Sequence, residues 1–293
     1  MSDVIQQFEE LRPDLARLAY RMLGTHADAD DVLQEAYLRW TGADQSSVRS
    51  PRAYLSSVVT RLCIDQRRQI EVRKETYVGP WLPEPVVEDD SMPAADRMDV
   101  AETVSLALMH VLETLNPVER AAYLLRKIFD YDYHEISEIL DKSEANCRQL
   151  VSRAESHVLS ERPRFEAPRE EVQRISDRFL QACSTGDIDG LVQLLSEDVI
   201  IYSDGGGKAT AALRPLEGVD RASRFLVGLF KKAPADLRLL QIRVNGQIGF
   251  AAYDTGKLVT IWTMDVVDHH IRRCFLIRNP DKLARVQLRH SAT

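Results

Sequence analysis

Apolar residues recur at helical spacing through the first quarter of the chain. The first set stops at Gly24, which is a good helix C-cap, and it comprises Phe8, Leu11, Leu15, Leu18, Ala19 and Met22. A second set predicts a helix over residues 28–40, whose early carboxylates suit the positive end of a helix dipole. Pro51 is tolerated in a first helical turn and opens a third helix. The pattern predicts a three-helix domain over residues 1–75.

Helical periodicity resumes near residue 101 and continues to about residue 163. It is interrupted at Asn116-Pro117, at residues 130–132 and at residues 141–143. The last interruption separates two short helices, and the second of them begins after Ser143, a good N-cap, with Cys147, Leu150, Val151 and Ala154 facing inward. Two helices joined by a three- or four-residue turn are typical of a helix-turn-helix.

The pattern changes from helical to alternating beyond Pro168. An amphipathic helix over residues 172–182 leads through Gly186 to a shorter helix. Strand-like segments follow, over residues 199–202, 237–244, 247–253, 258–266 and 274–278, with Asn245-Gly246 as one turn. Residues 168–293 are therefore predicted to form an α+β domain, which makes the protein multidomain.

The segment between the two helical domains, residues 76–100, is rich in proline and acid. Residues 84–102 hold seven acids against one basic residue, Arg97, which predicts an extended, solvated linker. Trp81 and Leu82 interrupt this polar stretch. Because such side chains are costly to leave in water, we expect this part of the linker to dock onto another surface.

Composition restricts the function further. The 293 residues are 44% hydrophobic, and no run approaches the roughly 20 apolar residues that a membrane-spanning helix needs. The polar, acidic N-terminus lacks a signal-peptide pattern, so we expect a cytoplasmic protein with no membrane partner. Cys63, Cys147, Cys183 and Cys274 are scattered, which predicts reduced, buried thiols, no metal site and no cofactor.

Charge is unevenly distributed. The net charge of -7 argues against a protein that coats nucleic acid by itself. Residues 49–74, however, hold seven Lys or Arg against two acids. Any contact with DNA phosphates is therefore expected to be local.

The outward side chains of the second helix of the helix-turn-helix suit a major groove. Arg pairs bidentately with guanine, and Asn or Gln pairs with adenine. The candidates for base contact are Asn146, Arg148, Gln149, Ser152 and Arg153, with Lys142 and Ser143 for phosphate. Taken alone, this pattern also fits an ordinary helical pair with a solvated face.

Three motifs that occur in a fixed order favour the DNA-binding interpretation. DADDVLQEAYLRW (residues 28–40), SPRAYLSSVVTRLCIDQRR (50–68) and LNPVERAAYLLRKIF (115–129), followed by the helix-turn-helix, resemble the extracytoplasmic-function (ECF) RNA polymerase sigma factors. The resemblance covers residues 1–163. It implies that residues 1–75 form sigma region 2 and residues 101–163 form sigma region 4, joined by the linker over residues 76–100.

The resemblance also implies partners and roles. Core RNA polymerase would be bound through its β′ clamp and β flap, with the clamp contacted by Asp31, Gln34 and Glu35. The -10 promoter element would be opened and read by Arg49, Arg52, Tyr54, Arg61, Arg67 and Arg68. The helix-turn-helix would read the -35 element. Arg61 and Tyr54 depart from the family pattern of Asn and Trp, so the promoter sequence does not transfer.

The remaining domain resembles the SnoaL-like branch of the cone-shaped NTF2 superfamily. WLPEP, DGGGK and NPDKL together resemble ECF sigma factors with a fused SnoaL-like domain. These pentapeptides give the candidate interdomain regulatory residues Trp81, Leu82, Pro83, Glu84, Pro85, Asp204, Gly205, Gly206, Gly207, Lys208, Asn279, Pro280, Asp281, Lys282 and Leu283. The resemblance implies regulation in cis, in place of a separate anti-sigma factor, by a domain with room for a small-molecule ligand.

Two alternatives remain at this stage. One is a helix-turn-helix regulator with a ligand-sensing domain, which would have no use for the basic helix after Pro51. The other is a SnoaL-like enzyme with a DNA-binding adaptor, for which the candidate pocket residues are Tyr202, Asp204, Trp262, Asp265 and His270. We expect a sigma factor and no catalysis.

Overall fold

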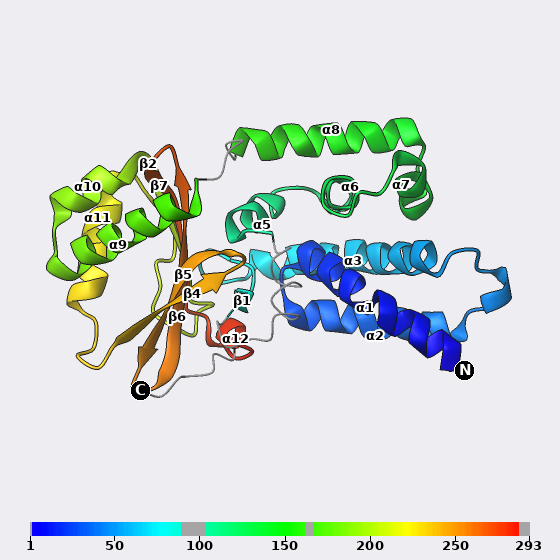
Figure 1. The fold of residues 1–293 in the computed structure, drawn as a ribbon, viewed down its shortest axis with the longest axis horizontal. Helices are drawn as coiled ribbons and strands as arrows, with labels where there is room; N and C mark the ends of the chain where they lie inside the picture. Colours follow the sequence, from blue (N-terminus) through cyan, green and yellow to red (C-terminus); the bar gives the residue numbers. More distant parts are fainter. Residues whose placement is uncertain (1, 89–103, 162–166, 287–293) are drawn as a thin grey trace. The chain divides into compact units, whose positions relative to one another are not determined.

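The chain divides into two compact units (Figure 1). The computed structural model describes residues 2–88, 104–161 and 167–286. The first unit comprises residues 1–76 and 108–162, and the second comprises residues 77–107 and 163–293. Nearly all of the predicted linker therefore belongs to the second unit, which also contains the C-terminal domain.

The N-terminal helices of the first unit follow the predicted pattern. They are α1 (Ser2–Leu23), α2 (His26–Gly42) and α3 (Pro51–Glu75), with a short 3-10 helix, η1 (Gln45–Ser47), before α3. Gly24 has a φ of 81°, which ends α1, and Thr25 caps α2 by accepting from the Asp28 N–H at 3.2 Å. Ser50 caps α3 ahead of Pro51, as the helix-start signals predict.

In the second group of helices, α6, α7 and α8 each begin directly after a predicted interruption. The elements are α5 (Leu106–Leu112), α6 (Pro117–Lys127), α7 (Tyr133–Leu140) and α8 (Glu144–Glu161). Asn116 caps α6, and Asp132 forms a capping box with Glu135 at the start of α7. Asp141 adopts a left-handed φ of 52°, which turns the chain between α7 and α8. All four side chains predicted to face inward from α8 are buried.

One buried carboxylate joins the two helical groups. Glu113, between α5 and α6, accepts from Arg67 of α3 and from Arg120 of α6, each at 2.7 Å, and it also pairs with Lys74. Arg120 donates twice more to the Arg21 carbonyl of α1. Burial alone would raise the pKa of Glu113, but the three cations hold it well below its usual range. The carboxylate is thus ionised and fixes α1, α3 and α6 together.

The second unit contains a seven-stranded sheet with the order β1-β4-β5-β6-β7-β2-β3. Its long strands are β2 (Leu195–Asp204), β4 (Arg238–Val244), β5 (Gln247–Asp254), β6 (Lys257–Val267) and β7 (His270–Ile277), and its short strands are β1 (Val87–Glu88) and β3 (Leu216–Glu217). The helices are α9 (Arg169–Thr185), α10 (Ile188–Leu194), α11 (Val219–Lys231) and α12 (Pro280–Leu283). The predicted order of α-helical domains and an α+β domain is confirmed.

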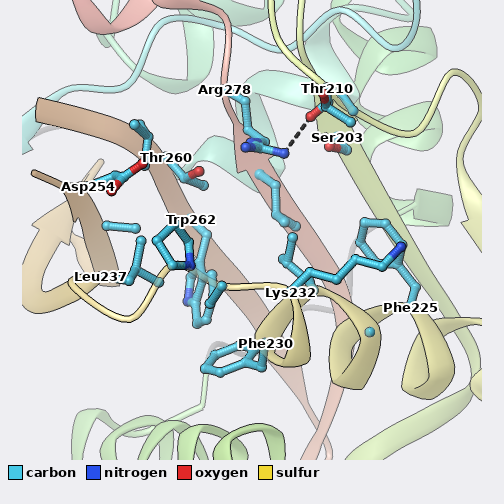
Figure 2. A pocket seen from close by; sticks show the side chains of 18 of the residues that line it. Ser203, Thr210, Phe225, Phe230, Lys232, Leu237, Asp254, Thr260, Trp262 and Arg278 are labelled. Atoms are coloured by element: carbon cyan, nitrogen blue, oxygen red, sulfur yellow. Dashed lines mark hydrogen bonds between the residues drawn. The ribbon is translucent and has the colours of Figure 1, made fainter.

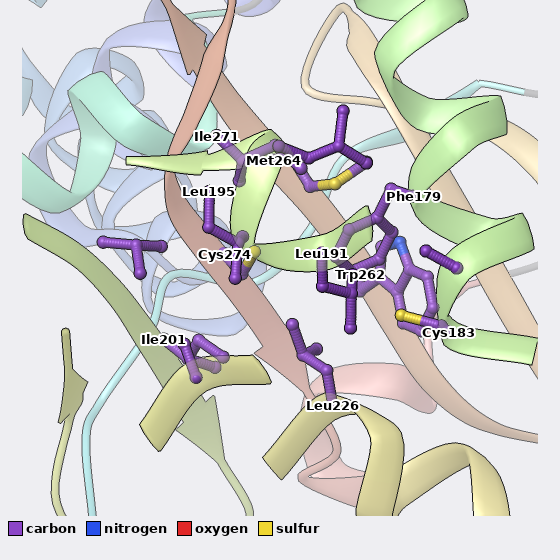
Figure 3. Close-up of a cluster of buried hydrophobic side chains, with 14 of the residues drawn as sticks. Phe179, Cys183, Leu191, Leu195, Ile201, Leu226, Trp262, Met264, Ile271 and Cys274 are labelled. Atoms are coloured by element: carbon purple, nitrogen blue, oxygen red, sulfur yellow. The ribbon is translucent and has the colours of Figure 1, made fainter. Parts of the chain in front are cut away.

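Helices α9, α10 and α11 cover one face of the sheet (Figure 1). Phe179, Leu191 and Leu226 from these helices pack against Trp262 and Leu276 of β6 and β7, which builds the larger core (Figure 3). Cys183 and Cys274 lie in this core, and the four cysteines of the described chain are free and buried as predicted. The sequence pattern missed α11, β1 and β3.

The linker covers the opposite face of the sheet. Leu82, Leu106 and Ala107 are each fully buried there, against Val244 and Phe275 among others. Asn245, in a left-handed turn with φ of 50°, holds both ends of this cover: its N–H donates to the Val86 carbonyl at 2.7 Å, and its Nδ2 donates to the Val104 carbonyl at 3.2 Å. Leu82 is docked as expected, whereas the expectation of a solvated linker is wrong for residues 82–85, which are all buried; Glu84 is 8% exposed. The acids over residues 89–102 lie outside the described residues.

The charge cluster at Glu113 makes a testable prediction about stability. In Glu113→Gln the buried guanidinium groups of Arg67 and Arg120 lose their counter-ion, so we expect the free energy of unfolding at pH 7 to fall by about 3–5 kcal/mol. Because the folded state lowers the pKa of Glu113, its contribution is complete above about pH 4.3 and is lost as the pH falls further. Urea unfolding at several pH values measures both effects. Asp65→Asn, which removes an exposed pair with Arg68, is the control and should leave stability unchanged.

Candidate functional site

The predicted recognition helix presents its polar face to solvent. Asn146, Gln149 and Ser152 are exposed on α8, as are Arg148 and Arg153, and Lys142 and Ser143 are exposed before its first turn. Arg148 pairs with Glu144 at 2.7 Å and lies 4.9 Å from the Tyr133 ring centroid. Arg153 pairs with Glu119 at 2.8 Å. Exposed pairs of this kind contribute little, so both arginines can exchange them for DNA at small cost.

Helix α2 carries a second exposed face. Asp31, Gln34 and Glu35 are all exposed, and they share one side of the helix by their i, i+3, i+4 spacing. Leu38 continues the same side at i+7 and is 57% exposed. Leu38 lies outside the buried stripe of α2 and was not among the predicted contact residues.

The residues predicted to read the -10 element lie just before α3 and along it, and helix α7 covers part of them. Arg52 lies 5.0 Å from the Tyr131 ring centroid, and Arg61 donates to the Ile139 carbonyl at 3.3 Å. The Ser56 hydroxyl shares a 2.7 Å hydrogen bond with the Tyr131 hydroxyl. The first turns of α3 are therefore engaged by residues that belong to the helix-turn-helix half of the unit.

A cavity of about 400 Å³ separates the rest of this surface from α7. Arg49 and Tyr54 line it on one side, and Glu135 and Glu138 line it on the other. Tyr54 is half-buried, with its ring centroid 5.6 Å from that of Trp40. Two carboxylates therefore face the surface that is predicted to bind the phosphate backbone.

Arg67 and Arg68 differ in position although they are adjacent. Arg68 is exposed and pairs with Asp65 at 3.0 Å. Arg67 is 1% exposed and donates to the carboxylate and the carbonyl of Glu113. Arg67 therefore does not belong to the exposed basic surface, because Glu113 draws it into the core of the unit.

The three pentapeptides meet in the second unit. The carboxylate of Asp204, at the end of β2, is fully buried and accepts three hydrogen bonds. The donors are the Tyr77 hydroxyl at 2.6 Å, the Leu82 N–H at 2.9 Å and the Lys282 ammonium at 2.6 Å. Two of these donors come from the linker and one comes from α12. A single carboxylate thus binds WLPEP and NPDKL to the DGGGK turn.

Lys282 sits between the linker and Asp204. Its ammonium also donates to the Leu82 carbonyl and lies 4.1 Å from the Trp81 ring centroid, where a cation–π interaction adds to the ion pair. Asn279 caps α12 and donates from Nδ2 to the Tyr77 hydroxyl at 2.9 Å. We refer to Tyr77, Trp81, Leu82, Asp204, Asn279 and Lys282 as the linker dock.

The glycine turn allows the linker to approach closely. Gly206 has a φ of 58°, and a Cβ there would lie 2.3 Å from Asn279 Nδ2 and 3.0 Å from the Tyr77 hydroxyl. Gly207 has a φ of 71°, and a Cβ there would meet Val78 at 3.3 Å. The turn therefore needs glycine at both positions, because the backbone has a positive φ and because a side chain would collide with the linker or with Asn279.

The protonated Tyr77 hydroxyl keeps the linker bound to Asp204 at neutral pH. Burial, together with the hydrogen bond to Asp204, raises the pKa of Tyr77 above its usual range. The phenol therefore stays protonated and keeps donating to the carboxylate. Asp281, next to Lys282, pairs instead with Lys208 at 2.5 Å on the exposed side of the turn.

The residues considered for catalysis do not converge. Tyr202 stacks on Phe275 on the linker side of the sheet, and Asp204 belongs to the linker dock. His270 is exposed, and Asp265 is buried near the far end of β6. Of the five, Trp262 alone lines the cavity of about 590 Å³ between α11 and the sheet (Figure 2). The five candidates of the enzyme alternative therefore do not surround one pocket, and alternate residues of a strand face opposite sides.

Comparison with known proteins places both helical domains. The Sigma-70 region 2 family matches residues 7–72, and the Sigma-70 region 4 family matches residues 105–158. The chain is 38% identical to the ECF RNA polymerase sigma factor SigJ of Mycobacterium tuberculosis, over 95% of this chain and 92% of SigJ. It is 28% identical to SigG of the same organism, over 84% of this chain and 72% of SigG.

A solved structure matches nearly the whole chain. The crystal structure of SigJ superposes with a TM-score of 0.76 at 35% sequence identity, covering 97% of this chain and all of that chain. The similarity therefore includes the C-terminal α+β domain as well as the two helical domains.

The linker dock makes a prediction that proteolysis can test. In Asp204→Ala two buried donors and one half-buried donor lose their acceptor, so we expect docking to weaken by about 3–5 kcal/mol and cleavage at Tyr77 and Trp81 by chymotrypsin to become at least tenfold faster. Lys208→Ala, which removes only an exposed ion pair, is the matched control. Equal cleavage rates in the two variants would contradict the role of Asp204.

Proposed function

The chain belongs to the ECF family of RNA polymerase sigma factors, and from this membership we propose that its C-terminal domain regulates promoter recognition in cis by holding the linker between regions 2 and 4. The single observation that carries the proposal is the linker dock, in which the buried Asp204 carboxylate binds Tyr77, Leu82 and Lys282. The regulated activity is promoter-directed transcription initiation.

In this proposal the first unit is a closed form of the two promoter-reading regions. Arg52 and Arg61 of region 2 are engaged by Tyr131 and Ile139 of region 4, and Glu135 and Glu138 face the remaining basic surface. The carboxylates of α7 occupy the side of α3 on which DNA phosphates are proposed to bind. Region 4 would therefore have to leave α3 before region 2 could open the -10 element.

The dimensions of promoter DNA support this requirement. The -35 and -10 elements are about 25 base pairs apart by their names, which is roughly 85 Å at 3.4 Å per pair. Helix α3, at 25 residues, is only about 38 Å long. Helix α7 packs against α3 in the first unit, so the two regions cannot reach both elements in this arrangement.

The linker sets how far the regions can separate. Residues 77–107 number 31 and span at most about 105 Å when fully extended. That length is sufficient for the promoter, but it is available only if the linker leaves the sheet. Most of this length cannot be extended while both ends of the segment remain bound to the second unit, through Tyr77, Leu82, Leu106 and Ala107. Release from the linker dock is therefore proposed as the regulated step.

The remaining assignments are also proposals. Core RNA polymerase is proposed to bind the α2 face, and promoter DNA to bind α3 and α8, in the cytoplasm. Because the restraint lies within the chain, it does not require a separate anti-sigma factor. No catalytic activity is proposed, since the acid and histidine side chains considered for it do not line the cavity between α11 and the sheet. No helix in the described part of the chain is long and apolar enough to cross a membrane.

Transcription reconstituted with core RNA polymerase tests the restraint. Asp204→Ala should raise the rate of promoter-specific initiation by the full-length protein at least threefold over wild type, because the linker is released, whereas Lys208→Ala should match wild type. Point variants suit this test better than truncation near Pro168, which would strip the cover from Leu82 and Leu106. Unchanged or reduced initiation by Asp204→Ala, with a folded protein, would reject the proposed restraint.

Core binding through α2 makes a separate prediction. Leu38→Ser removes an exposed apolar contact, so we expect at least a fivefold weaker affinity for core RNA polymerase with no loss of thermal stability. Val72→Ser, at a position 66% exposed on α3, provides the control. Fluorescence anisotropy measures the affinity for core RNA polymerase, and thermal melting measures the stability. Equal affinities in the two variants would contradict the assignment.

Recognition of the -35 element is tested at Arg148. Arg148→Ala should cost about 1–3 kcal/mol of promoter affinity if the guanidinium contacts a base bidentately, and it should relax the preference at one base pair. Gln149→Ala on the same helix should relax the preference at a different base pair. A wild-type footprint and an unchanged base preference for Arg148→Ala would contradict the assignment.

A further inference from the structure

The second unit contains a cavity that the proposed sigma activity does not use. Its volume is about 590 Å³, which lies within the usual range for small-molecule sites. It lies between α11, the loop that follows α11, and the sheet face that carries Trp262 and Leu276 (Figure 2). The linker dock, by contrast, lies at the other face of the same strands.

The cavity is mostly apolar, with one polar group at Ser203, Thr210 and Arg278 and further polar side chains at Lys232, Asp254 and Thr260. Figure 2 shows Ser203, Thr210 and Arg278 near one another, away from Phe230 and Leu237. Trp262 lies between the two groups and contributes an aromatic surface. The arrangement suits an elongated molecule with a hydrophobic body and a polar head.

The unsatisfied groups indicate what the head must be. Ser203 Oγ, Trp262 Nε1 and Arg278 Nε are buried without a hydrogen-bond partner in the part of the chain that the structure describes. All three can donate, and two can only donate. Native proteins rarely leave buried donors unpaired, so a ligand that supplies acceptor oxygens would satisfy them.

Arg278 also lacks a counter-ion. Its guanidinium donates to the Thr210 carbonyl, and it forms no ion pair among the described residues. Burial lowers its pKa, because no neighbouring carboxylate offsets the desolvation of its charge. An anionic head with two oxygens would pair with the guanidinium edge bidentately.

A glycine keeps this space open. Gly228 lies inside α11 and lines the cavity, and a Cβ added there would meet no atom within 4 Å. Glycine costs a helix interior about 0.5–1 kcal/mol relative to alanine, and neither a turn nor close packing requires it here. Its effect in the structure is to leave room in the cavity.

From these observations we infer that the cavity binds a small organic carboxylate with an apolar or aromatic body, with the carboxylate at Arg278 and Ser203 and the body along Trp262 and Phe230. The site stands independently of the proposed linker restraint.

The polar end of the site adjoins the linker dock. Ser203 precedes Asp204, and the Arg278 N–H donates to the Asp204 carbonyl at 2.7 Å. The loop at Thr210 continues to Ala212 and Leu213, which approach Gly79 of the linker. A ligand that reorganises Arg278 and this loop would change the affinity of the linker for its dock, and by linkage a released linker would change the affinity of the ligand. This second part rests on the proposed function.

Isothermal titration of the full-length protein tests the site. The probes are 2-naphthoate, 4-phenylbutyrate and decanoate, each compared with its uncharged primary amide. At least one carboxylate should bind one molecule per chain, tenfold or more tightly than its amide. If no carboxylate binds more tightly than its amide, the inferred site is wrong.

Two variants locate the binding. Gly228→Leu fills the cavity without a clash and should abolish binding while the thermal stability is kept or raised. Arg278→Gln should reduce carboxylate affinity at least tenfold and leave amide affinity unchanged, whereas Arg272→Gln, on β7 and outside the cavity, should bind as wild type does. Wild-type binding by Gly228→Leu would overturn the site even if Arg278→Gln failed to fold.

The connection to the linker is measured separately, as the rate of chymotrypsin cleavage at Tyr77 and Trp81 with and without saturating carboxylate. A change of at least threefold, absent in Gly228→Leu, supports the coupling. Ligand binding with an unchanged cleavage rate would overturn the coupling and leave the site intact. A failure of Asp204→Ala to alter transcription would instead count against the proposed function.

Discussion

The buried carboxylate of Asp204 is the interaction on which the arrangement of the second unit depends. A charge without solvent must be matched by donors, and here the donors come from segments more than 120 residues away in sequence, at Tyr77 and Leu82, and from Lys282. Because each partner is itself buried or half-buried, removing the carboxylate would leave several groups unsatisfied together. The linker is thereby made part of the C-terminal domain, where Leu82, Leu106 and Ala107 complete the core on one face of the sheet.

A second buried carboxylate, Glu113, has the corresponding role in the helical unit. It pairs with Arg67 and Lys74 of region 2 and with Arg120 of region 4, so the same charge joins the two regions that promoter recognition has to separate. Buried ion pairs add little net stability compared with apolar packing, but they penalise partial separation strongly. Such contacts favour two defined states, docked or released, over a continuous range of arrangements. In the proposed mechanism Asp204 controls the linker, and Glu113 and α7 close the promoter-reading surface.

Much of this architecture was predictable from the sequence. The helix boundaries at Gly24, Asn116 and Ser143 follow from local capping, and the inward and outward faces of α8 follow from its period. Docking of the linker at Trp81 and Leu82 was expected, but its place on the sheet was missed, because it joins segments distant in sequence. β6 is buried on both faces from Thr260 to Val266, but Thr263 and Asp265 make its sequence alternate, so no continuous apolar run indicated the second cover. Arg67 was misplaced because composition does not distinguish an exposed arginine from one that a distant glutamate draws inward. The three pentapeptides were identified as points of coupling, but the hydrogen bonds that join them required the structure.

The central claim is that the linker dock limits how far regions 2 and 4 can separate. It is tested most directly by the distance between nitroxide labels at Gln69 of α3 and Ser156 of α8, both exposed, measured by double electron–electron resonance in the full-length protein and in Asp204→Ala. The account predicts one short, narrow distance distribution for the wild type and an additional longer population in Asp204→Ala. Identical distributions in the two proteins would contradict it.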